Sequence, residues 1–424
     1  YNMVDSVVVG NFIGDQALAA VGTGFPIIFM LSSLFMGVGV GATVMISQYY
    51  GADDLKKVSE TVSTIYTAMI IGTIPLTLIG ILLTKPLLRL IQVPDDGTLE
   101  MAIIYMIVIF IGMIGNLGFN INAGILQGLG DSKTSLLFLL IASIINTVLD
   151  IVFVLVFHWG VFGVAFATII AQICSWIFGI YFINKHYDCI HIRVFKFTFD
   201  KDLFWKAMKL GIPSGIQQAL FSVGIMVMQS LVNEYGSSFM AGFMGANKID
   251  TFAFMPIQSF ATAITTYTGQ NIGAGKLDRV KLGTRAGMVL SVGCSLIICA
   301  VIYPISGFLM KMFSQNPVVI DAGVAYLHSV LPFFFLLGIS FIYSSVLRGA
   351  GEMIIPMISS FVGLWLARIP VAYFIADLWG RDYIFLSYPV GWLFGVMIAG
   401  IYYYTGRWKS KSITSTCNVA LNNS

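Results

Sequence analysis

The sequence predicts an all-α integral membrane protein whose twelve transmembrane helices form two lobes of six. Its composition, a series of apolar segments long enough to cross a bilayer, and an internal repeat carry this prediction. Of the 424 residues, 58% are hydrophobic and 10% are charged, and the mean hydropathy is +0.89. Because soluble proteins are about 25% charged, this composition excludes a soluble globular enzyme. The net charge of +3 is too small to indicate a nucleic-acid partner.

Eleven apolar segments are long enough to span, since one crossing needs about 20 apolar residues. The apolar run 1–13 precedes them and is shorter, so we interpret it as a first helix whose beginning is missing from this sequence. Connectors rich in glycine and charge, such as those at 51–57 and 128–133, separate the spans. The eleven predicted spans are 17–48, 58–84, 100–126, 134–157, 161–184, 204–233, 238–270, 282–310, 320–346, 353–377 and 382–405.

The basic residues predict the orientation, because Lys and Arg concentrate in short cytoplasmic loops. Alternate connectors differ sharply: one set holds 17 of the 23 Lys and Arg residues and the other holds 4. This asymmetry predicts a multi-pass protein of the cell membrane with both termini in the cytoplasm. It also predicts that the basic stretch 185–203 is a cytoplasmic linker between an N-terminal lobe, 1–184, and a C-terminal lobe with its tail, 204–424.

The two predicted lobes repeat each other. Residues of the first lobe recur 222 positions later without a gap: Gly14, Ala19, Gln48, Gly51, Ala52 and Leu55 correspond to Gly236, Ala241, Gln270, Gly273, Ala274 and Leu277. A unit with an even number of spans returns the chain to the side on which it started. We therefore expect a pseudo-twofold axis along the membrane normal and a substrate cleft between the lobes.

A few ionisable residues are predicted to lie deep within spans. An acid or a base in that position costs several kcal/mol unless it is paired or hydrated, so each is a candidate functional group. The alternative for each is a structural hydrogen bond or ion pair between helices. These residues are Asp5, Asp150, Lys248, Asp250 and Arg368.

Four polar residues are predicted to lie at one depth in the first lobe. Asn146 and Asp150 are four residues apart and share a helix face. Counting at about 1.5 Å per residue from the turn near 158–160 places Thr168 level with Asp150, and Asp5 falls in the same outer half of the membrane. Two carboxylates, an amide and a hydroxyl can form an oxygen cage for sodium. They can equally hold a proton, because burial and a second acid both favour the protonated form.

The repeat supplies a control for this cluster. The residues 222 positions after Asp5, Asp150 and Thr168 are Val227, Ala372 and Val390. A purely architectural role in a repeated fold is expected to recur in both copies. The cluster is absent from the second lobe, which favours a functional role for Asp5 and Asp150.

Candidates for the substrate cleft come from the second half of the chain: Gln217, Lys248, Asp250 and Arg368. Lys248 and Arg368 are predicted at similar depth, where either could gate the cleft, neutralise Asp250 or form a structural pair. Gln217 could line the cleft or hydrogen-bond between helices.

Several motifs, in order and in spacing, resemble the multidrug and toxic compound extrusion (MATE) family of the multidrug/oligosaccharidyl-lipid/polysaccharide flippase superfamily. The resemblance implies that Asp5, Asn146, Asp150 and Thr168 form the cation-coupling site of the first lobe. The motifs of the first half are Val4–Ser6 with Gly10, Ala17–Val21, Gln48–Ala52, Gly128–Asp131, Asn146–Asp150 and Gly163–Thr168, and those of the second are Gly211–Gly215, Gln270 with Gly273–Ala274, and Arg348–Gly351.

The sequence therefore predicts a secondary active multidrug efflux transporter. It would export amphiphilic, often cationic, compounds by alternating access in exchange for sodium or a proton, with no other cofactor. The sequence contains no phosphate-binding loop that would indicate ATP as the energy source. It also contains no nucleophile motif or catalytic metal-binding motif that would indicate an enzyme. We expect a monomer in contact with its substrates and with membrane lipids. The alternative is a flippase of lipid-linked cell-wall or polysaccharide precursors, which a basic cleft would favour.

Overall fold

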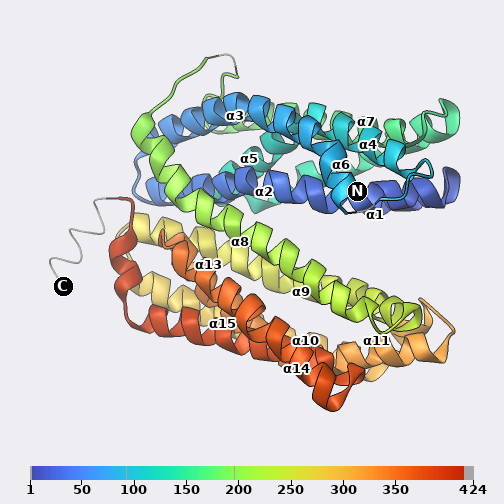
Figure 1. Cartoon of the computed structure of the whole chain (residues 1–424). Helices are drawn as coiled ribbons and strands as arrows, with labels where there is room; N and C mark the ends of the chain where they lie inside the picture. Colours follow the sequence, from blue (N-terminus) through green and yellow to red (C-terminus); the bar gives the residue numbers. More distant parts are fainter. Residues whose placement is uncertain (1, 92, 195, 415–424) are drawn as a thin grey trace. The chain divides into compact units, whose positions relative to one another are not determined.

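The computed structural model describes residues 2–91, 93–194 and 196–414, and every regular element in these ranges is helical (Figure 1). Tyr1 and the predicted tail 415–424 lie outside the described residues. In unit order along the chain, the longer helices are α1 (Asn2–Phe12), α2 (Asp15–Gly51), α3 (Leu55–Leu90), α4 (Thr98–Ile111), α5 (Met113–Leu129), α6 (Ser132–Ile151), α7 (Gly160–His186), α8 (Lys201–Asn233), α9 (Ser237–Gly273), α10 (Leu277–Lys311), α11 (Pro317–Val330), α12 (Phe334–Gly349), α13 (Ile354–Phe361), α14 (Ile369–Trp379) and α15 (Ser387–Tyr404).

Short helices of other geometry interrupt or extend these. Two are π-helices, which follow α6 and α13 directly, and three are 3₁₀-helices. Each of the five lies directly beside an α-helix or within two residues of one. They are η1 (Val152–Val156), η2 (Leu331–Phe333), η3 (Val362–Arg368), η4 (Arg381–Leu386) and η5 (Arg407–Lys411).

Nine helical segments of the described residues are long and apolar enough to cross a membrane, or ten if the bent pair α4 and α5 counts as one span. The helix α1 has 11 residues. The helix α9 has 37 residues, but its many polar residues keep it outside this set. Large apolar side chains are exposed along α10, where Val289 is 72% exposed, as expected for a surface that faces lipid. The protein is thus embedded in a membrane, and the full count of twelve spans stays a prediction.

The connectors between spans end and begin helices as their residues predict. Asp131 precedes α6 and accepts a hydrogen bond from the Thr134 backbone N–H at 3.1 Å, and Asp54 caps α3 in the same way through Lys57. Gly130 ends α5 with a positive φ of 94°, a conformation that glycine adopts without steric cost. The side chains of these short connectors satisfy backbone groups that a helix end leaves unpaired.

The predicted span 100–126 is not a single straight helix. It breaks at Gly112, and α4 and α5 differ in direction by 53°. A Cβ atom on Gly112 would overlap the Ile169 side chain on α7, so only glycine allows this close approach. The sequence contains no proline at this point that would have indicated the bend.

The chain divides into two compact units. Unit 1 comprises residues up to Ile46 together with Asp54–Ala219, and unit 2 comprises Ser47–Asp53 together with the residues from Leu220 onward. The division falls within α8, whereas the predicted linker 185–203 contains the last two residues of α7, the loop before α8 and the first three residues of α8. The predicted lobe boundaries, symmetry axis and cleft stay predictions.

Small residues bring helix backbones together within unit 1. Gly37 and Gly41 on α2 lie against α8, where a Cβ on Gly37 would overlap the Gly211 carbonyl oxygen and one on Gly41 would lie 2.7 Å from the Ala207 carbonyl oxygen. Gly211 is followed four residues later by Gly215, so both helices present a Gly-xxx-Gly surface. Van der Waals packing at such surfaces drives helix association in lipid, where the hydrophobic effect gives no advantage.

Repeated residues form a reciprocal contact within unit 2. A Cβ on Gly51 would overlap the backbone of Gln270, and a Cβ on Gly273 would overlap the backbone of Gln48. The Gln48 side chain also donates to the Gly349 carbonyl oxygen at 2.9 Å and accepts from the Ile413 N–H at 2.8 Å. The glycines of the internal repeat therefore occur where two helix ends touch backbone to backbone.

Candidate functional site

Four polar residues predicted to cluster in the first lobe come from three helices of unit 1. Asp5 lies on α1, Asn146 and Asp150 lie on α6, and Thr168 lies on α7. The helix α1 packs against α6, η1 and α7, which brings the four side chains together. Each of them is at most 4% exposed. We refer to these four residues as the unit 1 cluster.

Thr168 is at the centre of the unit 1 cluster. Its hydroxyl lies 3.4 Å from Asp5 Oδ2, 3.3 Å from Asn146 Nδ2 and 3.0 Å from the Val164 carbonyl oxygen. A hydroxyl has one proton to donate, so the bond to Val164 competes with the bond to Asp5. The two contacts to side chains are longer than an ordinary side-chain hydrogen bond. The four side chains of the cluster thus lie together, but the hydrogen bonds between Thr168 and the other side chains are long.

Oxygen atoms of the unit 1 cluster remain available for a ligand. Asp5 Oδ1, Asn146 Oδ1 and both carboxylate oxygens of Asp150 are buried without a hydrogen-bond partner. The two carboxylates also interact electrostatically with each other. An ionised carboxylate buried alone costs several kcal/mol, and two neighbouring ones repel. A bound cation with oxygen ligands, or a proton, would remove both penalties.

The helix that carries Asp150 changes geometry immediately after it. The π-helix η1 starts at Val152, and π-helical turns occur frequently at functional sites. Phe153 on η1 stacks on Phe166 of α7, with ring centroids 5.9 Å apart, and so adds apolar cover beside the cluster. Sequence reasoning did not find η1, because no residue type marks a π-turn.

A second buried polar cluster lies in unit 2 and contains two of the residues predicted for the cleft. Arg368 ends η3 and is 8% exposed, and its guanidinium carbon lies 3.1 Å from the centroid of the Tyr388 ring. Tyr388 on α15 meets Tyr326 on α11 edge to face, at 5.6 Å between ring centroids. Asp250 on α9 lies next to Tyr326 and interacts electrostatically with Arg368. We refer to these four residues as the unit 2 cluster.

The unit 2 cluster pairs an acid with a cation without a direct ion pair. No ion pair within 4.0 Å joins Asp250 and Arg368 in the part of the chain that the structure describes. Asp250 Oδ1, the Tyr326 hydroxyl and Arg368 Nε are buried without a hydrogen-bond partner. The sequence did not predict that Tyr326 and Tyr388 belong to this cluster, because an aromatic residue in an apolar helix does not indicate which residues of other helices it contacts.

The other two residues predicted for the cleft lie elsewhere. Lys248 is exposed on α9, two residues before Asp250, and so points away from that acid. Gln217 is half-buried on the part of α8 that belongs to unit 1. Within unit 2, the structure therefore assembles Asp250 with Arg368 but does not bring Lys248 to them.

A comparison with known families bears on this arrangement. The family model described as MatE matches residues 1–152 and 213–374. The chain belongs to the MatE family. This confirms the resemblance that the sequence motifs indicated, and the first matched region contains three residues of the unit 1 cluster: Asp5, Asn146 and Asp150.

Relatives of known name span nearly the same length as this MatE protein. It is 29% identical over 417 residues to the probable multidrug resistance protein YpnP of Bacillus subtilis, covering 97% of this chain and 92% of that one. It is 23% identical over 356 residues to the multidrug export protein MepA of Staphylococcus aureus, covering 83% and 78% of the two chains. An outward-facing multidrug resistance MATE transporter structure matches with a TM-score of 0.89 at 22% identity, over 97% of this chain and 92% of that one.

Proposed function

We propose that this MatE protein is a secondary active efflux transporter that exports amphiphilic, often cationic, compounds in exchange for sodium or a proton. The observation that carries this proposal is the unit 1 cluster, where two buried acids lie together and, among the described residues, no base forms a hydrogen bond or an ion pair with either. The names of the relatives YpnP and MepA support multidrug export. MatE proteins are transporters, and this chain carries no motif for ATP hydrolysis.

In the proposed mechanism, the two acids of the unit 1 cluster bind the coupling ion. Asp5 and Asp150 would supply carboxylate oxygens, and Asn146 and Thr168 would supply an amide and a hydroxyl oxygen. Binding of one positive charge neutralises the repulsion between the two carboxylates, which otherwise disfavours the packing of α1 against α6 in a medium of low dielectric. Release of the ion restores that repulsion.

Exchange follows if the ion and the cargo favour different conformations. The helix α1 contacts α6, η1 and α7 and carries one acid, so a change of charge at Asp5 alters how α1 packs. A ligand shifts a conformational equilibrium only by its differential affinity for the two states, and the effect is reciprocal between ligands. Ion and cargo therefore need no shared site. The cell membrane, cytoplasmic termini and a monomeric state are parts of the same proposal.

Vesicles that contain the purified protein test this function. A fluorescent cationic dye is added, and a sodium gradient or a proton gradient is imposed in separate experiments. We expect dye movement against its own gradient under one of the two ion gradients, and loss of that movement when an ionophore dissipates the ion gradient. The response to the two gradients identifies the coupling ion.

Protein-free vesicles and vesicles without an ion gradient serve as controls. If neither gradient drives any of a panel of cationic dyes, drug export by ion exchange is wrong. Transfer of a fluorescent lipid between leaflets, measured in the same vesicles, then tests the flippase alternative.

A further inference from the structure

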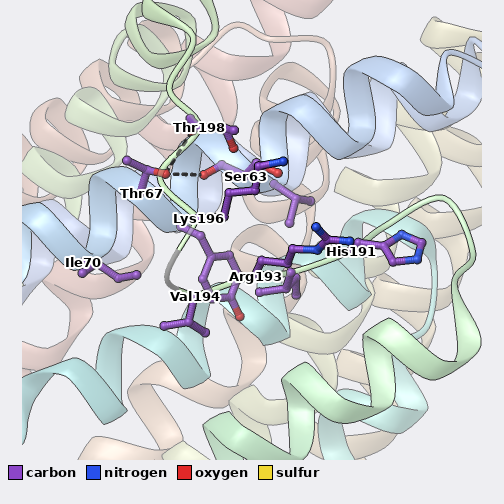
Figure 2. A pocket seen from close by; sticks show the side chains of 11 residues that line it. Ser63, Thr67, Ile70, His191, Arg193, Val194, Lys196 and Thr198 are labelled. Atoms are coloured by element: carbon purple, nitrogen blue, oxygen red, sulfur yellow. Dashed lines mark hydrogen bonds between the residues drawn. The ribbon is translucent and has the colours of Figure 1, made fainter.

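A polar pocket lies beside the first half of α3 (Figure 2), and no residue of the unit 1 cluster lines it. Its volume is about 240 Å³. One wall is α3, and the other is the loop between α7 and α8. The lining residues are Val62, Ser63, Tyr66, Thr67, Ile70, His191, Ile192, Arg193, Val194, Lys196 and Thr198.

Hydrogen bonds attach this loop to helices at two places. Near its middle, the Asn184 side chain of α7 accepts from the Ile192 N–H at 2.7 Å and donates to the Ile192 carbonyl oxygen at 3.0 Å. Near its end, the Thr67 hydroxyl lies 2.9 Å from the Thr198 carbonyl oxygen, a bond drawn in Figure 2. The Asp200 N–H donates to the Thr64 hydroxyl at 3.2 Å. The pocket is therefore a built feature in which Ile192, Thr198 and Asp200 are held by side chains of α7 and α3.

Positive charge in the pocket is not neutralised by nearby acids. Arg193 and Lys196 both line it, and neither takes part in an ion pair within the described residues. Two acids near the lining residues along the chain have other partners. Glu60 pairs with Lys56 at 3.9 Å, and Asp200 accepts from two backbone N–H groups at the start of α8. The pocket thus presents two basic side chains, together with the His191 ring and the Ser63 hydroxyl.

The size and chemistry of the pocket fit a small anion. Pockets for drug-sized ligands measure about 300–1,000 Å³, so this one is small for the proposed cargo, and its two cations would repel cationic compounds. Guanidinium and ammonium groups bind phosphate strongly, the first by paired hydrogen bonds and the second as a point charge. Ile70, Ile192 and Val194 add apolar contact area beside them.

We propose that this pocket binds a phosphate-bearing anionic group, and that the membrane supplies it as the headgroup of an anionic phospholipid. The pocket lies beside α3, a membrane-spanning segment, on the side that the basic residues predict to be cytoplasmic. Basic pockets of that kind at the cytoplasmic ends of spans bind acidic headgroups. Free phosphate has the same chemistry and is distinguished by experiment.

Native mass spectrometry of the detergent-purified full chain measures the binding. Phosphatidylglycerol, phosphatidylcholine and inorganic phosphate are titrated separately. We expect saturable binding of phosphatidylglycerol and no saturable binding of phosphatidylcholine. In Arg193→Gln/Lys196→Gln, affinity for phosphatidylglycerol should fall about 25-fold, or about fivefold for each charge removed. Saturable binding of inorganic phosphate that depends on the same two residues would identify the free anion as the ligand.

A matched control separates the pocket from general surface charge. Lys201→Gln/Lys209→Gln removes two exposed cations from α8, in the same basic stretch but outside the pocket, and should leave the affinity unchanged. Equal losses in both double variants, or no loss in the pocket variant, would overturn the proposal. The melting temperature of each variant in detergent without lipid shows whether it is folded, and the single variants Arg193→Gln and Lys196→Gln serve if the double variant is not.

Discussion

The two units differ in how they bury charge. The unit 1 cluster holds two acids, Asp5 and Asp150, with an amide and a hydroxyl and no base. The unit 2 cluster holds one acid and one base, Asp250 and Arg368, separated by more than an ion-pair distance and accompanied by two tyrosines. Both contain buried polar atoms without a partner.

This difference separates two uses of buried charge. An acid and a base on packed helices neutralise each other, so the unit 2 cluster is electrically complete without a ligand and favours one packed arrangement. Two acids cannot neutralise each other, so the unit 1 cluster requires an ion or a proton. We expect changes in the unit 1 cluster to alter transport more than stability, and changes in the unit 2 cluster to do the reverse.

The largest expected effect is on coupled transport. Asp5→Asn and Asp150→Asn should each reduce gradient-driven dye movement in vesicles to the level of protein-free vesicles, because an amide cannot exchange a proton and holds a cation weakly. Asn146→Ala should weaken the dependence on the ion concentration without abolishing transport. Full coupled transport by both acid variants would move the coupling site away from unit 1.

Arg368→Met should cause the largest loss of stability. It would leave the Asp250 carboxylate, one oxygen of which is buried, without a neighbouring positive charge. The loss should be at most the roughly 3–5 kcal/mol found when a buried ion pair in direct contact is broken. The matched control is Arg381→Met, since Arg381 and its neighbour Asp382 are exposed and 3.7 Å apart, and such a pair is worth about 0–1 kcal/mol. Melting temperatures of the two purified variants test the prediction, and equal values would contradict it.

Two substitutions of Tyr388 separate its ring from its hydroxyl. Tyr388→Leu removes the aromatic face on which the guanidinium of Arg368 lies and should cost about 2 kcal/mol. Tyr388→Phe keeps that face and should cost less than about 1 kcal/mol. Melting temperatures rank the variants. If Phe is as harmful as Leu, the hydroxyl and not the cation–π contact holds Arg368.

The smallest expected effect is the change in stability when an acid of the unit 1 cluster is replaced. Asp150→Asn removes one of two neighbouring buried acids and should raise the stability by about 1 kcal/mol or leave it unchanged. Asp250→Asn should lower it, because Arg368 then remains as an uncompensated buried charge. Chemical or thermal unfolding of both variants at neutral pH tests this opposite sign. A similar loss in the two variants would show that the clusters are not different in kind.

Helix geometry predicted that the residues of the unit 1 cluster lie at similar depth. The four-residue spacing of Asn146 and Asp150 and the depth count to Thr168 need only the rise per residue of an α-helix. In the structure, Thr168 contacts Asp5 and Asn146, and Asp150 interacts electrostatically with Asp5. The resemblance to the MATE family pointed to the same residues.

Features that depend on packing between helices could not be predicted. The close approach of Gly112 to Ile169 on another helix could not be read from local sequence. The neighbours of Arg368, Tyr388 and Asp250, come from α15 and α9, which are far apart in sequence. Hydropathy also missed the broken and π-helical segments within predicted spans, because it measures composition and not backbone geometry. Local sequence was sufficient to predict where helices occur. Predicting their bends and π-helical turns would have required knowledge of the helices that pack against them.

Release of the coupling ion when cargo binds tests the central claim most directly. Purified protein is loaded with radioactive sodium or kept in weak buffer, dye is added, and displaced sodium or released protons are measured. The account predicts ion release by the wild-type protein and by Asp250→Asn, and none by Asp5→Asn or Asp150→Asn, with dye binding retained in all four. Release that persists in both unit 1 variants and disappears in Asp250→Asn would contradict it.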